Sequence, residues 1–118
     1  MNSNKVSRTK ISNSAASLKR IRNQAKTENI RFTQHAHQEM VEEGITINEV
    51  LETIASGDII EDYPEHRRGA CCLLNGITNH SRPLHIVCTT TQASLIIITV
   101  YEPKLPKWIT PTQRRRQE

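Results

Sequence analysis

Aromatic residues are scarce in this chain of 118 residues: one Trp, two Tyr and one Phe make up 3% of it. Proteins that hold single-stranded nucleic acid without sequence preference stack successive bases on aromatic side chains. The composition therefore argues against a dedicated single-strand binder. It does not argue against a nuclease that contacts mainly phosphate.

Long apolar runs are missing too. The longest, residues 95–100, is interrupted by Thr99 and is far shorter than the roughly 20 residues of a membrane-spanning helix. The N-terminus is basic but has no apolar segment of the kind that secretory signals carry. We therefore expect a cytoplasmic protein that does not contact the membrane.

The cysteines fit no disulfide framework, because there are three and two are adjacent: Cys71, Cys72 and Cys88. We expect buried, unreactive thiols. The sequence also lacks C-x-x-C and H-x-x-x-H pairs. In a helix, His35 and His37 would point in different directions. We therefore predict no metal site and no cofactor.

Charge is unevenly distributed along the chain. Residues 1–31 contain eight Lys or Arg and one acid, residues 32–66 contain nine acids and no Lys or Arg, and the net charge is +4. This pattern suggests a polyanion such as RNA for the basic segments and a different, basic partner for the acidic helices. The alternative is a solvated surface with two frayed cationic tails.

The N-terminal third is predicted to be helical. Residues 1–11 are polar and expected to be disordered, whereas apolar residues from Ala15 to Ala25 recur at helical spacing from Ser12 on. This basic amphipathic helix either docks on the domain or orders only on a partner. We divide the chain into a basic extension with this helix (1–28), an α+β core domain (29–109) and a basic tail (110–118).

Two more helices are expected. One begins near Thr33 and ends at Gly44. The other begins with a capping box formed by Thr46 and Glu49 and ends at Gly57.

After residue 57 the periodicity becomes that of strands, which we place at residues 59–63, 70–74, 83–89 and 95–101. Asn75–Gly76 is read as a turn, and short connections favour antiparallel pairing. Prolines follow the last strand, and Trp108 is expected to fold back onto the core. The predicted fold is α+β, with N-terminal helices packed on one face of a four-stranded antiparallel sheet.

Strand parity assigns side chains to the two faces of this sheet. Alternate residues of the last two strands form the face that the helices would cover: Leu84, Ile86, Cys88, Ile96, Ile98 and Val100. His85 and Tyr101 fall on the opposite, uncovered face. A hairpin centred on Gln92 sets Tyr101 diagonal to His85, and one centred on Ala93 sets it directly across, within about 5–8 Å in either case. This pair is the leading candidate site.

His35 is a second candidate, because it lies in the first turn of a predicted helix. The positive end of the helix dipole disfavours a charged imidazole there, so His35 is better placed as a neutral base. Glu39 and Glu42 share its face, which is otherwise interpreted as a solvated acidic stripe.

A series of short motifs extends across the core, in order, at residues 33–36 (TQHA), 44–46 (GIT), 57–60 (GDII), 63–64 (YP), 73–76 (LLNG), 82–87 (RPLHIV) and 99–103 (TVYEP), followed by Trp108. With these motifs the stretch from Arg31 to Trp108 resembles a small bacterial family, domain of unknown function 4258.

The resemblance implies a fold similar to the barnase, colicin and RelE-like ribonucleases. It also implies a setting in which the protein is a toxin beside a zinc-finger antitoxin of the MqsA type. In two respects the sequence departs from the family. Glu43 stands where the family usually has an arginine that could contact phosphate, and the basic N-terminal extension lies outside the resemblance.

The sequence is consistent with two functions. The first is a metal-independent endoribonuclease in which the RNA 2′-hydroxyl attacks its own phosphate. His85 is the acid–base group, Tyr101 a donor or second acid, and His35 the alternative base. Arg82 is the expected phosphate clamp, and the other candidate substrate-binding residues are Thr99, Arg67 and Arg68. The second is a non-catalytic module of the same fold that binds nucleic acid or protein, with Glu43 as a sign of lost activity.

Overall fold

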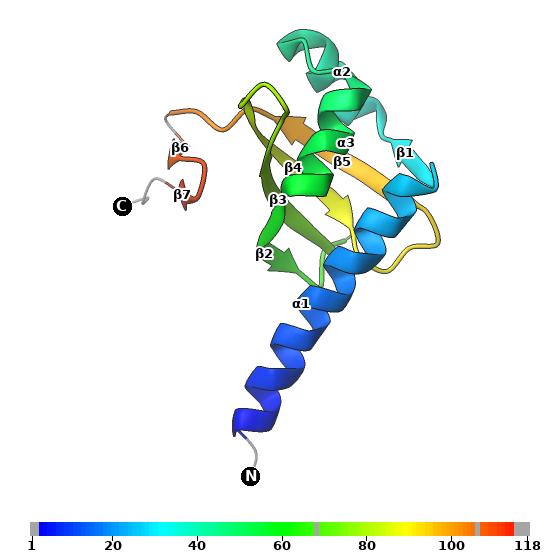
Figure 1. Cartoon of the computed structure of the whole chain (residues 1–118), viewed down its shortest axis with the longest axis vertical. Helices are drawn as coiled ribbons and strands as arrows, with labels where there is room; N and C mark the ends of the chain where they lie inside the picture. Colours follow the sequence, from blue (N-terminus) through cyan, green and yellow to red (C-terminus); the bar gives the residue numbers. More distant parts are fainter. Residues whose placement is uncertain (1–2, 68, 106, 115–118) are drawn as a thin grey trace.

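A computed structural model describes residues 3–67, 69–105 and 107–114, with side chains from residue 14 on. Three helices, a five-stranded sheet and a short two-stranded sheet make up this part of the chain (Figure 1). In chain order the elements are α1 (Ser3–Lys26), β1 (Ile30–Phe32), α2 (Gln34–Glu43), α3 (Ile47–Ser56), β2 (Asp58–Tyr63), β3 (Cys71–Ile77), β4 (Pro83–Thr89), β5 (Leu95–Tyr101), β6 (Trp108–Thr110) and β7 (Gln113–Arg114).

The α+β class is confirmed, but the four-stranded antiparallel sheet is not. The strand order is β1-β5-β4-β3-β2, and β1 pairs with β5 in parallel, which makes the sheet mixed. Strands β2 to β5 pair antiparallel, as predicted. β1 has only three residues, too few for a sequence period to reveal, and it forms because Ile30 and Phe32 pack against the core.

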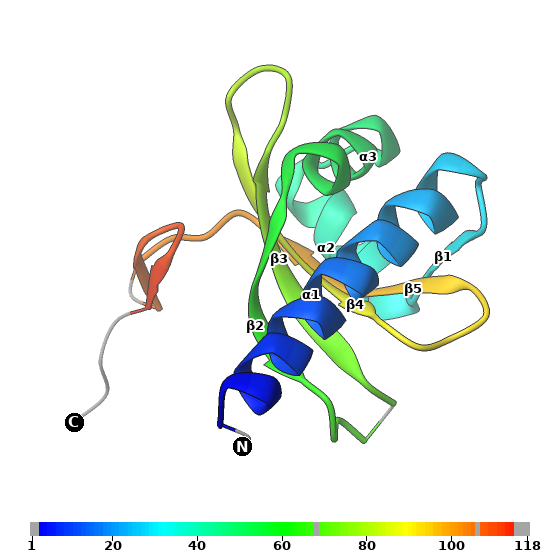
Figure 2. The same cartoon turned by 60° about the horizontal axis from the view of Figure 1, so that its bottom comes forward.

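The first helix begins at Ser3, so the expectation that residues 1–11 are disordered is wrong for those that the structure describes. The N-terminal half of α1 projects beyond the sheet, whereas its C-terminal half lies beside α3 (Figures 1 and 2). Ile21 and Ala25 are buried there within the core cluster. Residues 14–26 are therefore packed together with residues 29–109.

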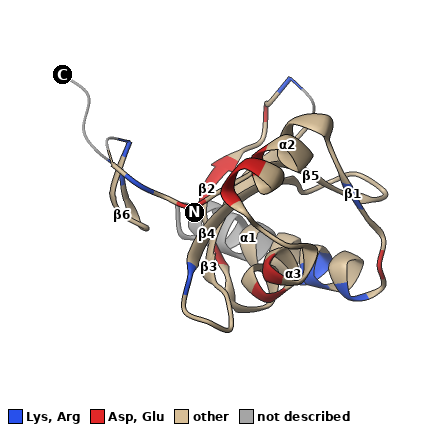
Figure 3. Ribbon diagram, turned by 90° about the horizontal axis from the view of Figure 1, so that it is seen from above, with Lys and Arg blue, Asp and Glu red and all other residues tan. Residues whose placement is uncertain are grey.

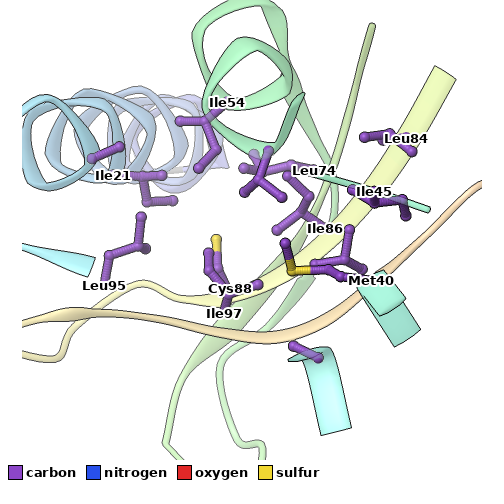
Figure 4. Packing of buried hydrophobic residues seen from close by; sticks show 14 of the residues in the cluster. Ile21, Met40, Ile45, Ile54, Leu74, Leu84, Ile86, Cys88, Leu95 and Ile97 are labelled. Atoms are coloured by element: carbon purple, nitrogen blue, oxygen red, sulfur yellow. The ribbon is translucent and has the colours of Figure 1, made fainter. Parts of the chain in front are cut away.

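One core lies between the helices and one face of the sheet (Figure 4). A β-bulge in β5 changes which side chains of this strand face the core. Pairing passes from Val87–Thr99 to Cys88–Ile97, so Ile98 is the extra residue. The prediction that Ile96 and Ile98 face the helices is therefore wrong; from β5 the core takes Leu95, Ile97 and Val100.

Asn75 and Gly76 lie within β3 and do not form the predicted turn. The connection to β4 is formed by residues 78–82, where Ser81 has a positive φ of 66°. Ser56 at the end of α3 holds β3 in place, because its hydroxyl bonds both the N–H and the carbonyl of Ile77. Gly76 is consequently packed against the last turn of α3.

Both predicted helix starts are confirmed. The Thr33 side chain accepts a hydrogen bond from the Ala36 N–H. At α3, Thr46 and Glu49 form the reciprocal capping box. Gly44, with φ of 65°, ends α2 in the left-handed conformation.

Replacing Thr46 with alanine is expected to lower the free energy of unfolding by about 1 kcal/mol, because the Glu49 N–H loses its side-chain acceptor. Urea denaturation measures the change. Asn48→Ala, in the exposed first turn of the same helix, is the control. Equal stability of Thr46→Ala and wild type would contradict the role of the cap.

Candidate functional site

The two leading candidate residues lie directly opposite each other on adjacent strands. His85 of β4 pairs with Tyr101 of β5, which is the register expected from a hairpin centred on Ala93. Their ring centroids are 5.3 Å apart, and His85 Nδ1 lies 3.2 Å from the Tyr101 hydroxyl. Strand parity therefore identified a real contact.

We predicted that the face carrying this pair is uncovered. The prediction is wrong, because the C-terminal residues cross this face. Residues 107–114, which we call the C-terminal clasp, contain β6 and β7 and lie on the side of the sheet opposite the helices (Figure 2). His85 is 0% exposed and Trp108 is 2% exposed. Trp108 does fold back, as expected, but onto the outer face.

The clasp makes two contacts with the His85 ring. The Trp108 ring meets it edge-on, with centroids 4.4 Å apart, and His85 Nε2 lies 2.6 Å from the Pro111 carbonyl oxygen. Since a carbonyl only accepts, Nε2 carries a proton and donates it. In neutral His85 the Nδ1 atom is then the acceptor, and the Tyr101 hydroxyl donates to it.

The far end of the clasp is held by an ion pair on β2. Arg114 donates to both carboxylate oxygens of Glu61, at 2.8 and 3.1 Å, and its guanidinium lies 4.6 Å from the centre of the Trp108 ring. The Tyr63 hydroxyl donates to the same carboxylate. Arg114 lowers the pKa of Glu61, so this anchor stays charged.

Burial sets the protonation of the pair. It lowers the pKa of His85, against the opposing effect of the Pro111 carbonyl, and so favours the neutral imidazole. Burial also raises the pKa of Tyr101, which keeps its hydroxyl protonated. Glu61 favours the charged form of His85, whereas Arg114 and Lys107 oppose it.

We expect the stability of the protein to fall as the pH drops below about 6.5, the ordinary pKa of histidine. Over this range His85 of the unfolded chain binds a proton, whereas buried His85 of the folded protein stays neutral. The stability is therefore greatest above that pH and is lost as the pH falls toward the lower pKa of folded His85. NMR titration of the His85 ring, in the folded protein and in the urea-unfolded chain, measures the two midpoints. A folded midpoint at or above the unfolded one would contradict the prediction.

Arg82, the expected phosphate clamp, lies on the helix side of the sheet and donates to groups within the fold. It bonds the Glu102 carboxylate at 2.9 Å and the carbonyls of Glu43 and Gly44 at 2.7 and 3.1 Å. It also lies 3.5 Å from the Glu49 carboxylate. Arg82 thus joins β4 and β5 to the α2–α3 corner, away from His85.

The other candidate binding residues are spread over the sheet. Thr99 precedes Tyr101 by two residues on the same face of β5. Arg67 is exposed in the loop between β2 and β3. That loop ends at Cys71. Along β3, Cys71 lies four residues, or about 13 Å, from Asn75, which pairs with His85. Arg68 lies outside the described residues.

His35 lies in the first turn of α2 and is exposed, with Nε2 3.5 Å from Glu39 Oε1. The same Glu39 oxygen accepts the N–H of Val100, next to Tyr101. Glu43 accepts the N–H of Glu102 in the same way, at 3.0 Å. Glu39 and Glu43 of α2 therefore bind the free N–H groups at the end of β5, beyond the short β1, which gives Glu43 a structural role.

Sequence reasoning missed Asn75 and Glu61, which the register places on the same face as His85. Asn75 was assigned to a turn, and Glu61 follows a register shift in β2. Among the described residues, the buried Asn75 Oδ1 atom has no hydrogen-bond partner. Asn75 follows Leu73 by two residues, so continuing the strand alternation by one residue beyond Leu74 would have placed Asn75 on the face of Leu73.

The thiols of Cys71, Cys72 and Cys88 are free and buried, as expected. Within residues 3–67, 69–105 and 107–114, no group of three or more His, Cys, Asp or Glu side chains is placed to hold a metal ion. No helix in the same ranges is long and apolar enough to cross a membrane.

Comparison with known proteins identifies the central part of the chain. No curated protein and no solved structure matches it. One family model does, domain of unknown function 4258, over residues 32–102, which extends from the end of β1 past Tyr101 and leaves the C-terminal clasp outside. This confirms the resemblance noted from the motifs. The chain is a member of the family described as domain of unknown function 4258.

Proposed function

We propose that the protein is a metal-independent endoribonuclease whose acid–base group is His85. The observation that carries the proposal is the contact between the His85 imidazole and the Tyr101 hydroxyl, on the face of the sheet opposite the helices. An imidazole coupled to a protonated phenol can accept one proton and deliver another, which is what cleavage by the RNA 2′-hydroxyl requires.

In this mechanism His85 Nε2, when it no longer contacts Pro111, takes the proton of the 2′-hydroxyl, while Nδ1–H donates to Tyr101. The 2′ oxygen bonds phosphorus and the bond from phosphorus to the 5′ oxygen breaks. That oxygen takes a proton from Tyr101 or from the imidazolium. The products are a 2′,3′-cyclic phosphate and a 5′-hydroxyl. His35, in the first turn of α2, is the alternative base.

Positive charge for RNA binding would come from α1 and from Arg115 and Arg116 of the C-terminal tail. In Figure 3 blue segments of Lys and Arg lie on α1, whereas red segments of Asp and Glu lie on α2, α3 and β2. Arg20 and Arg22 of α1 bond backbone carbonyls of the domain, but Lys19 and Lys26 are exposed. We propose RNA as the partner of the basic surface.

The proposal extends to the setting. Helices on one face of the antiparallel strands β2 to β5 support a RelE- or barnase-like fold, although the parallel β1 adds to it. We propose a cytoplasmic toxin, inhibited by a cognate antitoxin protein that contacts the acidic helices.

A specific observation favours a second candidate, the non-catalytic binding module. Both ring nitrogens of His85 are already hydrogen-bonded, and Arg82 bonds groups of the fold. In that case His85 and Tyr101 stabilise the sheet and the protein acts by binding alone.

The test incubates the protein, free of any partner, with a broad panel of RNAs in EDTA. Wild type and Arg114→Ala, which loses the ion pair with Glu61, are compared. Cleavage products ending in 2′,3′-cyclic phosphate support the nuclease. If the RNA stays intact with both proteins, the nuclease proposal fails and the binding module remains. Activity that appears only with added zinc would indicate a metal hydrolase instead.

A further inference from the structure

The C-terminal clasp contacts His85, the middle one of a row of three polar side chains. Asn75, His85 and Tyr101 lie opposite one another on β3, β4 and β5. The clasp satisfies His85 through Pro111, but Asn75 Oδ1, in the same row, stays buried without a hydrogen-bond partner. A buried polar atom without a hydrogen-bond partner destabilises the state that buries it. The cover is therefore a poor match for the row beneath it.

The clasp is also joined to the domain by few contacts. β6 and β7 pair with each other in a sheet of their own, so they do not extend the main sheet. From the end of β5 the chain crosses the outer face to β2, where the Arg114–Glu61 pair holds it. The Arg114 side chain is 40% exposed, so solvent screens its ion pair with Glu61, and the pair stabilises the closed clasp only modestly.

We propose that the C-terminal clasp is an autoinhibitory cover that single-stranded RNA must displace to reach Asn75, His85 and Tyr101. The proposal rests on the proposed function in naming RNA as the ligand. The closed clasp puts the Pro111 carbonyl on His85 Nε2, the atom that would accept the 2′-hydroxyl proton, and places the Trp108 ring against the imidazole. Substrate and clasp therefore cannot occupy the site together.

Trp108 is the only tryptophan of the chain and reports directly on clasp opening. Buried in the closed state, it should show a blue-shifted emission and weak quenching by acrylamide. Addition of a 2′-O-methyl RNA oligonucleotide, which binds but cannot be cleaved, should shift the emission to longer wavelength and increase the quenching. Emission and quenching that stay unchanged at saturating oligonucleotide would overturn the proposal.

Arg114→Ala should open the clasp by removing the ion pair and the contact with the Trp108 ring. We expect about tenfold tighter binding of the same oligonucleotide, because apparent affinity scales with the open fraction. Glu61→Gln weakens the same ion pair from the sheet side and should act in the same direction. Arg31→Ala, at an exposed arginine of the edge strand β1, is the matched control. Circular dichroism checks that each variant is folded.

The outcomes separate this proposal from the proposed function. Tighter binding with cleavage supports both. Tighter binding without cleavage keeps the autoinhibitory cover and rejects the nuclease. More exposed Trp108 in folded Arg114→Ala and Glu61→Gln, with RNA affinity equal to wild type, overturns the cover whatever the cleavage result.

Discussion

His85→Ala is expected to reduce RNA cleavage by about 100-fold or more when it is introduced together with Arg114→Ala, the variant that opens the clasp. An acid–base group contributes a factor of about 10² to 10⁴ to such reactions. His85 is the only imidazole that the structure places against the Tyr101 hydroxyl, among the described residues. Initial rates on the best RNA of the panel, measured in EDTA, give the comparison.

Two further variants separate chemistry from folding. Tyr101→Phe keeps the ring and removes only the hydroxyl that is hydrogen-bonded to His85 Nδ1, so it should lower the rate while leaving the fold intact. His37→Ala, at an exposed histidine of α2, is the matched control and should cleave like its parent. A His85→Ala variant that is folded and cleaves at the parental rate would remove His85 from the mechanism.

Gly76→Ala is expected to lower the free energy of unfolding by about 3 kcal/mol. A Cβ atom at this position would lie 2.4 Å from the Thr53 carbonyl oxygen and 3.0 Å from the Gly57 Cα. Both neighbours are backbone atoms, which cannot rotate away, so α3 and β3 would have to separate. Insertion of a methyl group into such tight packing typically costs about 1–3 kcal/mol, and here the upper end applies.

Gly44→Ala gives the comparison for this prediction. No heavy atom lies within 4 Å of a Cβ at Gly44, but its φ of 65° is unfavourable for alanine, at a cost of about 1–2 kcal/mol. Urea midpoints of the two variants therefore separate a steric clash from backbone strain. If Gly76→Ala proved as stable as wild type, the close contact between α3 and β3 would be wrong.

Local features were predictable from the sequence because they depend on neighbouring residues. The caps at Thr33 and Thr46 need only a side-chain oxygen three residues before a free N–H. The antiparallel strands β2 to β5 follow from alternation and short connections, and parity brought His85 to Tyr101. The family was recognisable too, since its motifs from Thr33 to Glu102 lie within the matched residues 32–102.

Features that depend on distant residues were decided only by the tertiary structure. β1 exists because β5 has an edge to pair with, and Gly76 extends β3 because α3 packs against it. The bulge at Ile98 exchanged the faces of the residues before it. Whether the His85 face is open depended on a C-terminal segment 26 residues away, whose Pro111 carbonyl reaches the imidazole. No local pattern encodes such a contact, because its energy comes from burial between segments that meet only in the fold.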